Sequence, residues 1–184
     1  MKKWSIDKLQ NTWHLVSKLH QGQKYGANEE GLHIEYINHI GSVVFEVIQS
    51  LDHEDSLDGD LAVTCALLHD TIEDTETTFE KIKSLFGEQI ANGVSALTKN
   101  TAMESKEDQM KDSLTRIIQQ PKEVWSVKMA DRICNLYSPP YYWDAEKKKQ
   151  YYAESVLIYD TLKDGNAYLA ARLKEKIENY KIHF

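Results

Sequence analysis

Leu67-Leu68-His69-Asp70-Thr71-Ile72-Glu73-Asp74 closes the most apolar segment of the chain. The residues from about 60 onward are apolar on nearly all sides, which predicts a central helix over 60–72 that other helices cover. A buried helix rarely ends in three carboxylates and an imidazole unless something compensates their charge. The negative end of the helix dipole disfavours anions further. A bound cation would resolve this conflict, and a solvated helix end with a hydrogen-bonded histidine is the alternative.

Residues four apart on a helix share a face. On a continuous helix His69 therefore lies over Glu73, and Asp70 lies over Asp74. This spacing predicts one polar cluster at the carboxyl end of the helix.

Two other apolar segments carry polar residues of the same kind. They are Tyr36-Ile37-Asn38-His39 and Lys128-Met129-Ala130-Asp131-Arg132-Ile133-Cys134-Asn135. Two imidazoles and two carboxylates, with waters completing an octahedron, suit Mn²⁺ or Fe²⁺ better than Mg²⁺ or a closed zinc site. Four donors from three helices could thus converge on one metal ion: His39, His69, Asp70 and Asp131.

The rest of the chain also repeats with a helical period, and no segment keeps the two-residue period of a strand. Gly22, Gly26 and Gly31 mark a loop, and Thr77 with Glu80 forms a capping box for a helix. We find no internal repeat or linker, so we expect a single all-α domain over 1–184 with eight or nine helices. The other helices are expected over 5–23, 35–51, 88–98, 105–119, 121–138, 146–163 and 166–181.

Composition excludes several classes of protein. The formal net charge is −7, which argues against general binding of DNA or RNA through the phosphate backbone. Cys65 and Cys134 lie in apolar helical contexts and form no disulfide framework. No apolar run is long enough to span a membrane, and polar residues interrupt any signal-peptide core. We therefore expect a reduced, cytoplasmic protein.

The order His … His-Asp … Asp resembles that of the HD-domain metal-dependent phosphohydrolases. The sequence is more closely similar to the hydrolase domain of the RelA/SpoT alarmone enzymes and to their stand-alone small relatives. The resemblance covers roughly residues 15–140, and its most specific part is the HDxxED run with KxADRxxN downstream. The matching motifs are His20-Gln21-Gly22-Gln23, Tyr36-Ile37-Asn38-His39, Ala66-Leu67-Leu68-His69-Asp70-Thr71-Ile72-Glu73-Asp74-Thr75, Phe86-Gly87, Leu97-Thr98-Lys99, Lys128-Met129-Ala130-Asp131-Arg132 and Asn135-Leu136.

The resemblance implies an HD-domain helical bundle that the C-terminal helices over 146–181 complete. It implies that the four donors are metal ligands, with Mn²⁺ the expected ion and Fe²⁺ or Mg²⁺ the alternatives. Glu73 and Asp74 match the acidic pair that positions and activates the attacking water. Asn135 and Ser138 match positions that contact the substrate.

The chain departs from the family pattern in two places. Ile40 follows the first metal histidine, where the family usually has proline. The family's basic pair, which helps to hold the guanine nucleotide, is replaced by Lys24-Tyr25. One cation is retained, and Tyr25 could stack on a base. Lys24 and Tyr25 are therefore candidate substrate-binding residues.

Further cations and aromatic rings are candidates for the substrate pocket. Lys99, Lys128 and Arg132 could receive a pyrophosphate group, and surface salt bridges are their alternative role. The aromatic residues within 141–152 could form a wall over a nucleotide base, although anchoring the loop to the domain is the favoured role.

The leading expectation is a metal-dependent (p)ppGpp 3′-pyrophosphohydrolase that converts guanosine 3′,5′-bis(diphosphate) to GDP and pyrophosphate. The altered pocket leaves open an HD-type phosphatase of another phosphorylated nucleotide, such as NADPH, which would release orthophosphate. A third expectation is a non-catalytic metal module that senses nucleotides. The partner in each case is a small phosphorylated nucleotide, and the oligomeric state stays open.

Overall fold

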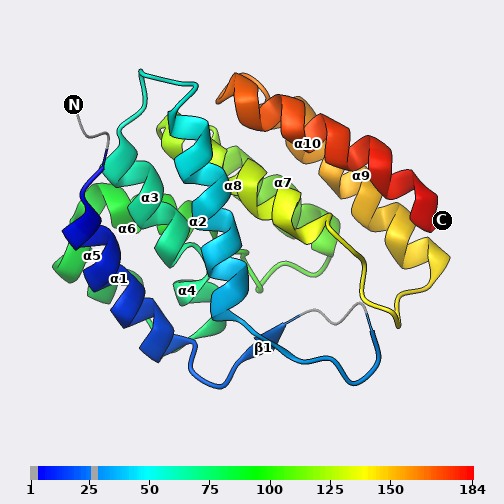
Figure 1. Ribbon diagram of the computed structural model, residues 1–184, viewed down its shortest axis with the longest axis horizontal. Helices are drawn as coiled ribbons and strands as arrows, with labels where there is room; N and C mark the ends of the chain where they lie inside the picture. The colour runs from blue at the N-terminus through cyan, green and yellow to red at the C-terminus, as the bar shows by residue number, and fades with distance from the viewer. Residues whose placement is uncertain (1–3, 26–28) are drawn as a thin grey trace.

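The computed structural model describes residues 4–25 and 29–184, which form a helical bundle with one small pair of strands (Figure 1). The all-α prediction is confirmed. The elements in chain order are α1 (Ile6–Leu19), β1 (Lys24–Tyr25), β2 (Ile34–Glu35), α2 (Ile37–Leu51), α3 (Gly59–Leu68), α4 (Thr71–Asp74), α5 (Phe79–Phe86), α6 (Glu88–Leu97), α7 (Lys106–Ile117), α8 (Lys122–Asn135), α9 (Ala145–Leu162), α10 (Ala167–Tyr180) and the 3₁₀ turn η1 (Lys181–His183).

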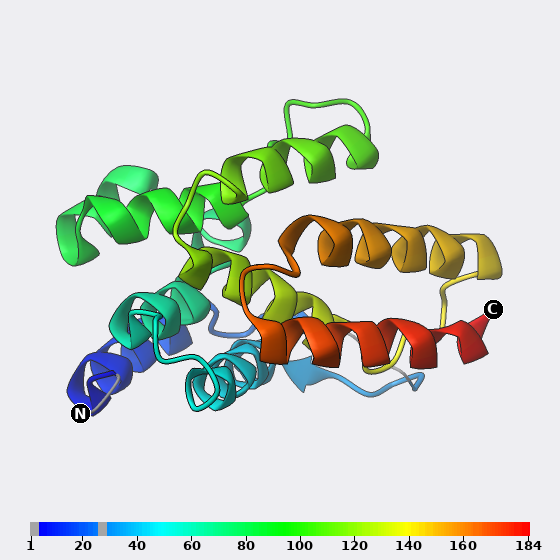
Figure 2. The ribbon, with the colours of Figure 1, turned by 90° about the horizontal axis from the view of Figure 1, so that it is seen from above.

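Helix α3 lies at the centre of the N-terminal part of the bundle. It packs against α1, α2, α6 and α8, and nine of its ten residues are buried. Helices α9 and α10 run side by side at the other end of the molecule, where both pack against α8 (Figures 1 and 2). The all-round apolar pattern of residues 60–68 therefore corresponds to a helix that neighbours cover on all sides.

The helix predicted over 60–72 is broken after Leu68, because two side chains compete for main-chain carbonyls. The Thr71 hydroxyl donates to the Leu68 carbonyl at 2.7 Å, and the His69 ring contacts the Ala66 carbonyl through Nδ1 at 2.8 Å. Such local side-chain contacts offer the backbone an alternative to helix continuation. The short helix α4 follows after Asp70. The polar residues from His69 to Asp74 therefore lie beyond the end of α3 and not on one of its faces.

Two smaller predictions also differ from the structure. The loop predicted after α1 contains the antiparallel pair β1–β2, in which Tyr25 lies opposite Ile34. Two residues a strand are too few to produce a detectable period in the sequence. Helix α5 begins one residue later than the predicted capping box, because Thr78 rather than Thr77 accepts from the Lys81 N–H. Gly26, one of the predicted loop glycines, lies outside the described residues.

None of the helices in residues 4–25 and 29–184 combines the length and the hydropathy that crossing a membrane requires.

Candidate metal centre and active site

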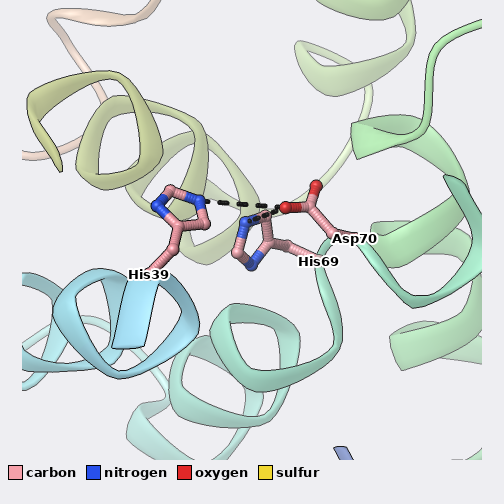
Figure 3. Close-up of side chains that lie close together, drawn as sticks. All are labelled: His39, His69 and Asp70. Carbon is pink, nitrogen blue, oxygen red and sulfur yellow. Dashed lines mark ion pairs between the residues drawn. The ribbon is translucent and has the colours of Figure 1, made fainter. Parts of the chain in front are cut away.

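His39, His69 and Asp70 come together at the broken end of α3 (Figure 3). His39 lies in the first turn of α2, and both histidines are almost fully buried. Asp70 Oδ2 lies 2.8 Å from His69 Nε2 and 3.8 Å from His39 Nε2. The ligand atoms of all three residues lie within 4.8 Å of one another. Helix packing alone thus places two ring nitrogens and a carboxylate at one point.

The surroundings of His69 favour a positive charge at this point. Its Nδ1 contacts the Ala66 carbonyl, which can only accept, so Nδ1 carries a proton. In the neutral ring, Nε2 would direct a lone pair at Asp70 Oδ2 from 2.8 Å, so a proton or a cation between these two atoms is favoured. Burial lowers the pKa of His69, but the Asp70 carboxylate outweighs burial and raises that pKa to about 9. A divalent cation among these donors satisfies the same demand, and the mixed imidazole and carboxylate set fits Mn²⁺ or Fe²⁺.

Asp131 on α8 lies beside this cluster. Its Oδ1 is 3.4 Å from His39 Nε2, although Asp131 lies outside the set of three residues whose ligand atoms all fall within 4.8 Å of one another. Lys128 Nζ lies 3.0 Å from Oδ2 of the same carboxylate, and Asn135 Nδ2 donates to Oδ1 at 2.6 Å. Burial opposes ionisation, but Lys128 and the two histidines hold the pKa of Asp131 well below its usual range.

The acidic pair occupies the turn that follows the cluster. Both Glu73 oxygens are held by Lys99, one by the side-chain Nζ at 2.6 Å and one by the main-chain N–H at 2.9 Å. The His69 ring contacts the Ala66 carbonyl and Asp70, and the Asp74 N–H donates to the Asp70 carbonyl at 2.9 Å. Partial burial and the nearby Asp70 charge raise the pKa of Asp74. The two carboxylates therefore have different environments.

A cavity of about 360 Å³ opens over the cluster and the acidic pair. Cationic side chains from four parts of the chain line it, which makes it suitable for an anion. Of these, Lys106 and Lys147 were not predicted, and Lys147 lies within the lysine run 147–149. The cationic lining residues are Lys99, Lys106, Lys128, Arg132 and Lys147.

A second cavity of about 720 Å³ adjoins the first, and Tyr25, Asn135, Trp143 and Tyr151 line both. We call the first the charged cavity and the second the aromatic cavity. Ser138 lines the aromatic cavity but not the charged cavity. The sequence analysis did not single out several of the described residues that line it, among them Ile34, Ser42, Phe45 and Glu46.

The segment 141–152 both anchors a loop and forms a wall. The Trp143 and Tyr151 rings contact each other with centroids 5.1 Å apart, and both line the two cavities. Tyr141 and Tyr142 are exposed. The two roles considered for these aromatic residues therefore coexist.

Two predicted substrate contacts are engaged elsewhere. Lys24 pairs with Glu35 across the β1–β2 sheet and lies outside both cavities. Arg132 lines the charged cavity, but its guanidinium stacks 4.0 Å from the centre of the Tyr151 ring and donates to Ser155. Arg132 thus connects α8 to α9.

Proteins of known name are similar to this chain in sequence. A protein of Danio rerio named guanosine-3′,5′-bis(diphosphate) 3′-pyrophosphohydrolase MESH1 is 31% identical over 174 residues, 91% of each chain. The Aquifex aeolicus protein named guanosine-3′,5′-bis(diphosphate) 3′-pyrophosphohydrolase is 30% identical over 159 residues, 85% of this chain and 21% of its own length.

A solved structure is similar to this chain in fold, and a family model matches most of the chain. The structure titled "A metazoan ortholog of SpoT hydrolyzes ppGpp and plays a role in starvation responses" superposes with a TM-score of 0.79 at 24% identity, over 96% of this chain and 97% of the other. The family model described as "HD domain" matches residues 12–167, which span α1 to the start of α10 and include the whole histidine and aspartate cluster. The chain therefore belongs to the HD domain family.

Proposed function

We propose that this protein is a metal-dependent (p)ppGpp 3′-pyrophosphohydrolase, which converts guanosine 3′,5′-bis(diphosphate) to GDP and pyrophosphate. The observation that carries the proposal is the charged cavity, in which a cation-demanding cluster and an acidic pair face a set of lysines. The relatives named as pyrophosphohydrolases support the same reaction.

His39, His69, Asp70 and Asp131 are the proposed metal ligands, and Mn²⁺ is the proposed ion, with Fe²⁺ or Mg²⁺ as alternatives. The first three bring their ligand atoms within 4.8 Å, and Asp131 adds an oxygen 3.4 Å from His39. A bound divalent ion supplies activation of water and neutralisation of phosphate charge.

Asp74 is the proposed general base, and Glu73 is proposed to orient the attacking water. The raised pKa of Asp74 makes its carboxylate a stronger proton acceptor than an ordinary surface aspartate. Lys99 fixes both oxygens of Glu73, so this carboxylate is suited to positioning. The water oxygen bonds to the phosphorus next to the ribose 3′ oxygen, and one water proton passes to Asp74. The bond between this phosphorus and the 3′ oxygen breaks, and the leaving 3′ oxygen takes up the proton that Asp74 accepted.

The lysines of the charged cavity are proposed to receive the pyrophosphate group. Lys99 stays charged because Glu73 raises its pKa against the opposing effect of burial. Lys128 is buried beside Asp131, whereas Lys106 on α7 and Lys147 on α9 line the cavity without an ion pair of their own in the described contacts. Free cations of this kind can pair with substrate oxygens as they enter.

The aromatic cavity is proposed to hold the nucleoside. Tyr25 lines both cavities and offers a face on which a base can stack, and Asn135 and Ser138 supply polar groups at the same place. Lys24 and Arg132 are weaker candidates for direct contact, since Glu35 and α9 engage them.

A phosphatase acting on NADPH or a similar nucleotide is the second candidate. Tyr25 favours it, because this residue replaces a cation with a ring that has no preference for guanine. The volume of the aromatic cavity, about 720 Å³, leaves room for a larger ligand than one nucleoside. We also propose that the protein acts in the cytoplasm, which the free thiols of Cys65 and Cys134 support.

The test is turnover of ppGpp by metal-stripped protein, with and without added Mn²⁺. The expected result is Mn²⁺-dependent release of GDP and pyrophosphate in equal amounts. NADPH assayed in parallel distinguishes the second candidate, which would release orthophosphate. Mn²⁺ binding without turnover of either nucleotide would contradict both proposals.

A further inference from the structure

The turn from Asp70 to Asp74 is held at both ends by residues that precede α2 in the chain. Tyr36 contacts the Asp70 side chain, and Gln23 contacts the Asp74 main chain. We propose that His20, Gln23 and Tyr36 form a polar strut that positions the metal ligand Asp70 and the general base Asp74. The inference deepens the proposed function and rests on it for the roles of these two carboxylates.

The first contact of the strut fixes the orientation of Asp70. The Tyr36 hydroxyl donates a hydrogen bond to Asp70 Oδ2, the same oxygen that faces both cluster histidines. The Tyr36 ring stacks on His20 with centroids 5.1 Å apart, and its main-chain N–H donates to the Gln23 carbonyl at 2.9 Å. Hydrogen bonds of this kind orient carboxylate ligands and tune metal affinity.

The second contact of the strut holds the far end of the turn. Gln23 Nε2 donates to the Asp74 carbonyl at 2.8 Å, so Gln23 Oε1 faces His20 Nδ1 at 2.7 Å. The amide orientation therefore requires the proton of His20 to lie on Nδ1. His20 is 2% exposed, and its Nε2 has no hydrogen-bond partner. The ring thus serves to orient Gln23.

The turn needs external support because it is short. Helix α4 has four residues, and the chain leaves it at Thr75 in an extended conformation. A single helical turn is unstable by itself, since few hydrogen bonds offset the ordering of its backbone. The His20-Gln21-Gly22-Gln23 motif, which the proposed reaction does not otherwise use, supplies that support.

The Tyr36 contact is tested with Mn²⁺ alone, by calorimetric titration of metal-stripped protein. We expect Tyr36→Phe to weaken Mn²⁺ binding about tenfold or more, because the Asp70 carboxylate loses its fixed orientation. Tyr168→Phe is the matched control, since Tyr168 is also partly buried but stacks on His53. Equal Mn²⁺ dissociation constants for Tyr36→Phe and the wild type would overturn this half of the strut.

The Gln23 contact is tested by the division between kcat and KM and by hydrogen exchange. We expect Gln23→Met to lower kcat for ppGpp about tenfold or more, with KM and the Mn²⁺ dissociation constant unchanged, and to speed amide exchange over residues 70–75. His20→Leu should have the same effects, and His20→Asn should restore kcat because its amide donates from the place of Nδ1. An unchanged kcat in Gln23→Met, or no difference between the two His20 variants, would overturn this half.

Failure of the proposed reaction is distinguishable from failure of the strut. If the wild type binds Mn²⁺ but does not hydrolyse ppGpp, the proposed function is wrong. The Mn²⁺ titrations of Tyr36→Phe and the exchange rates of Gln23→Met then still decide the strut, because neither measurement needs a substrate.

Discussion

The two adjoining cavities differ in how their walls are built. The charged cavity takes much of its chemistry from residues at or near the ends of helices, where ion pairs fix groups such as Glu73 and Asp131. The aromatic cavity is formed by residues of α2 and α8 together with strand and loop residues, and several of its rings are exposed, including Phe45 at 70% and Tyr137 at 78%. A rigid, charged wall suits the reaction itself, whereas an open, apolar wall suits selection of the ligand. The two walls should therefore respond differently to mutation.

The largest effect is expected for a residue of the metal cluster. In His69→Gln the cluster loses a ring nitrogen, so we expect bound Mn²⁺ and Mn²⁺-dependent turnover to be lost together. Elemental analysis and pyrophosphate release measure the two. His53→Gln is the control, since His53 is exposed and stacks on Tyr168. Full turnover by His69→Gln would show that the cluster is not the reaction centre.

The next effect concerns Asp74, which separates proton transfer from metal binding. We expect Asp74→Asn to retain Mn²⁺ and to lose about 10²–10⁴-fold in kcat, the usual contribution of a general base. The base works only when deprotonated, and burial and Asp70 raise its pKa. As the pH is lowered, wild-type activity should therefore be lost at a higher pH than the pKa of an ordinary aspartate would predict.

The control for this second prediction is Glu76→Gln, which removes an exposed acid two residues away. We expect it to keep the wild-type kcat and pH profile. If the residual activity of Asp74→Asn still decreases over the same low-pH range, another group is responsible for that decrease.

The two cavities also differ in how far the sequence predicted them. His39, His69-Asp70 and Asp131 stand out because each places a metal-binding side chain in an apolar helix. The break after Leu68 could not be predicted from helical spacing, since it depends on which carbonyls Thr71 and His69 reach. The local pattern thus singled out residues that lie close together in the structure, but it did not predict the break that sets their geometry.

Most of the residues that line the aromatic cavity could not be predicted from the sequence, for a different reason. Phe45 is one of several apolar residues of α2, and the neighbouring sequence does not show that its ring faces a cavity instead of the core. Lys147 lies in a lysine run, which usually marks a solvated helix face, but the packing of α9 beside α7 and α8 brings it to the charged cavity. These assignments depend on contacts between elements distant in sequence.

A smaller effect is expected where the two cavities meet. We expect Tyr25→Ala to raise KM for ppGpp about tenfold with kcat unchanged, because stacking of a base on an aromatic ring contributes about 1–3 kcal/mol. Tyr25→Phe keeps the ring and should keep KM. Steady-state kinetics of the pair measure the effect. A lower kcat at constant KM in Tyr25→Ala would place the ring at the reaction rather than at the nucleoside.

The smallest effect is expected for a substitution at Phe45. Its effect on KM helps to distinguish between ppGpp and NADPH as the substrate. Phe45 lines the aromatic cavity but not the charged one, and its ring is already largely exposed, so Phe45→Ser should change the free energy of unfolding by less than about 0.5 kcal/mol. A single nucleoside stacked near Tyr25 does not need this outer part of the wall, so KM for ppGpp should be unchanged. A dinucleotide carries a second base and sugar that must lie farther from the metal cluster. If Phe45→Ser raises KM for NADPH and leaves that for ppGpp unaltered, the outer aromatic wall binds the larger ligand, and the phosphatase reaction becomes the better account of this cavity.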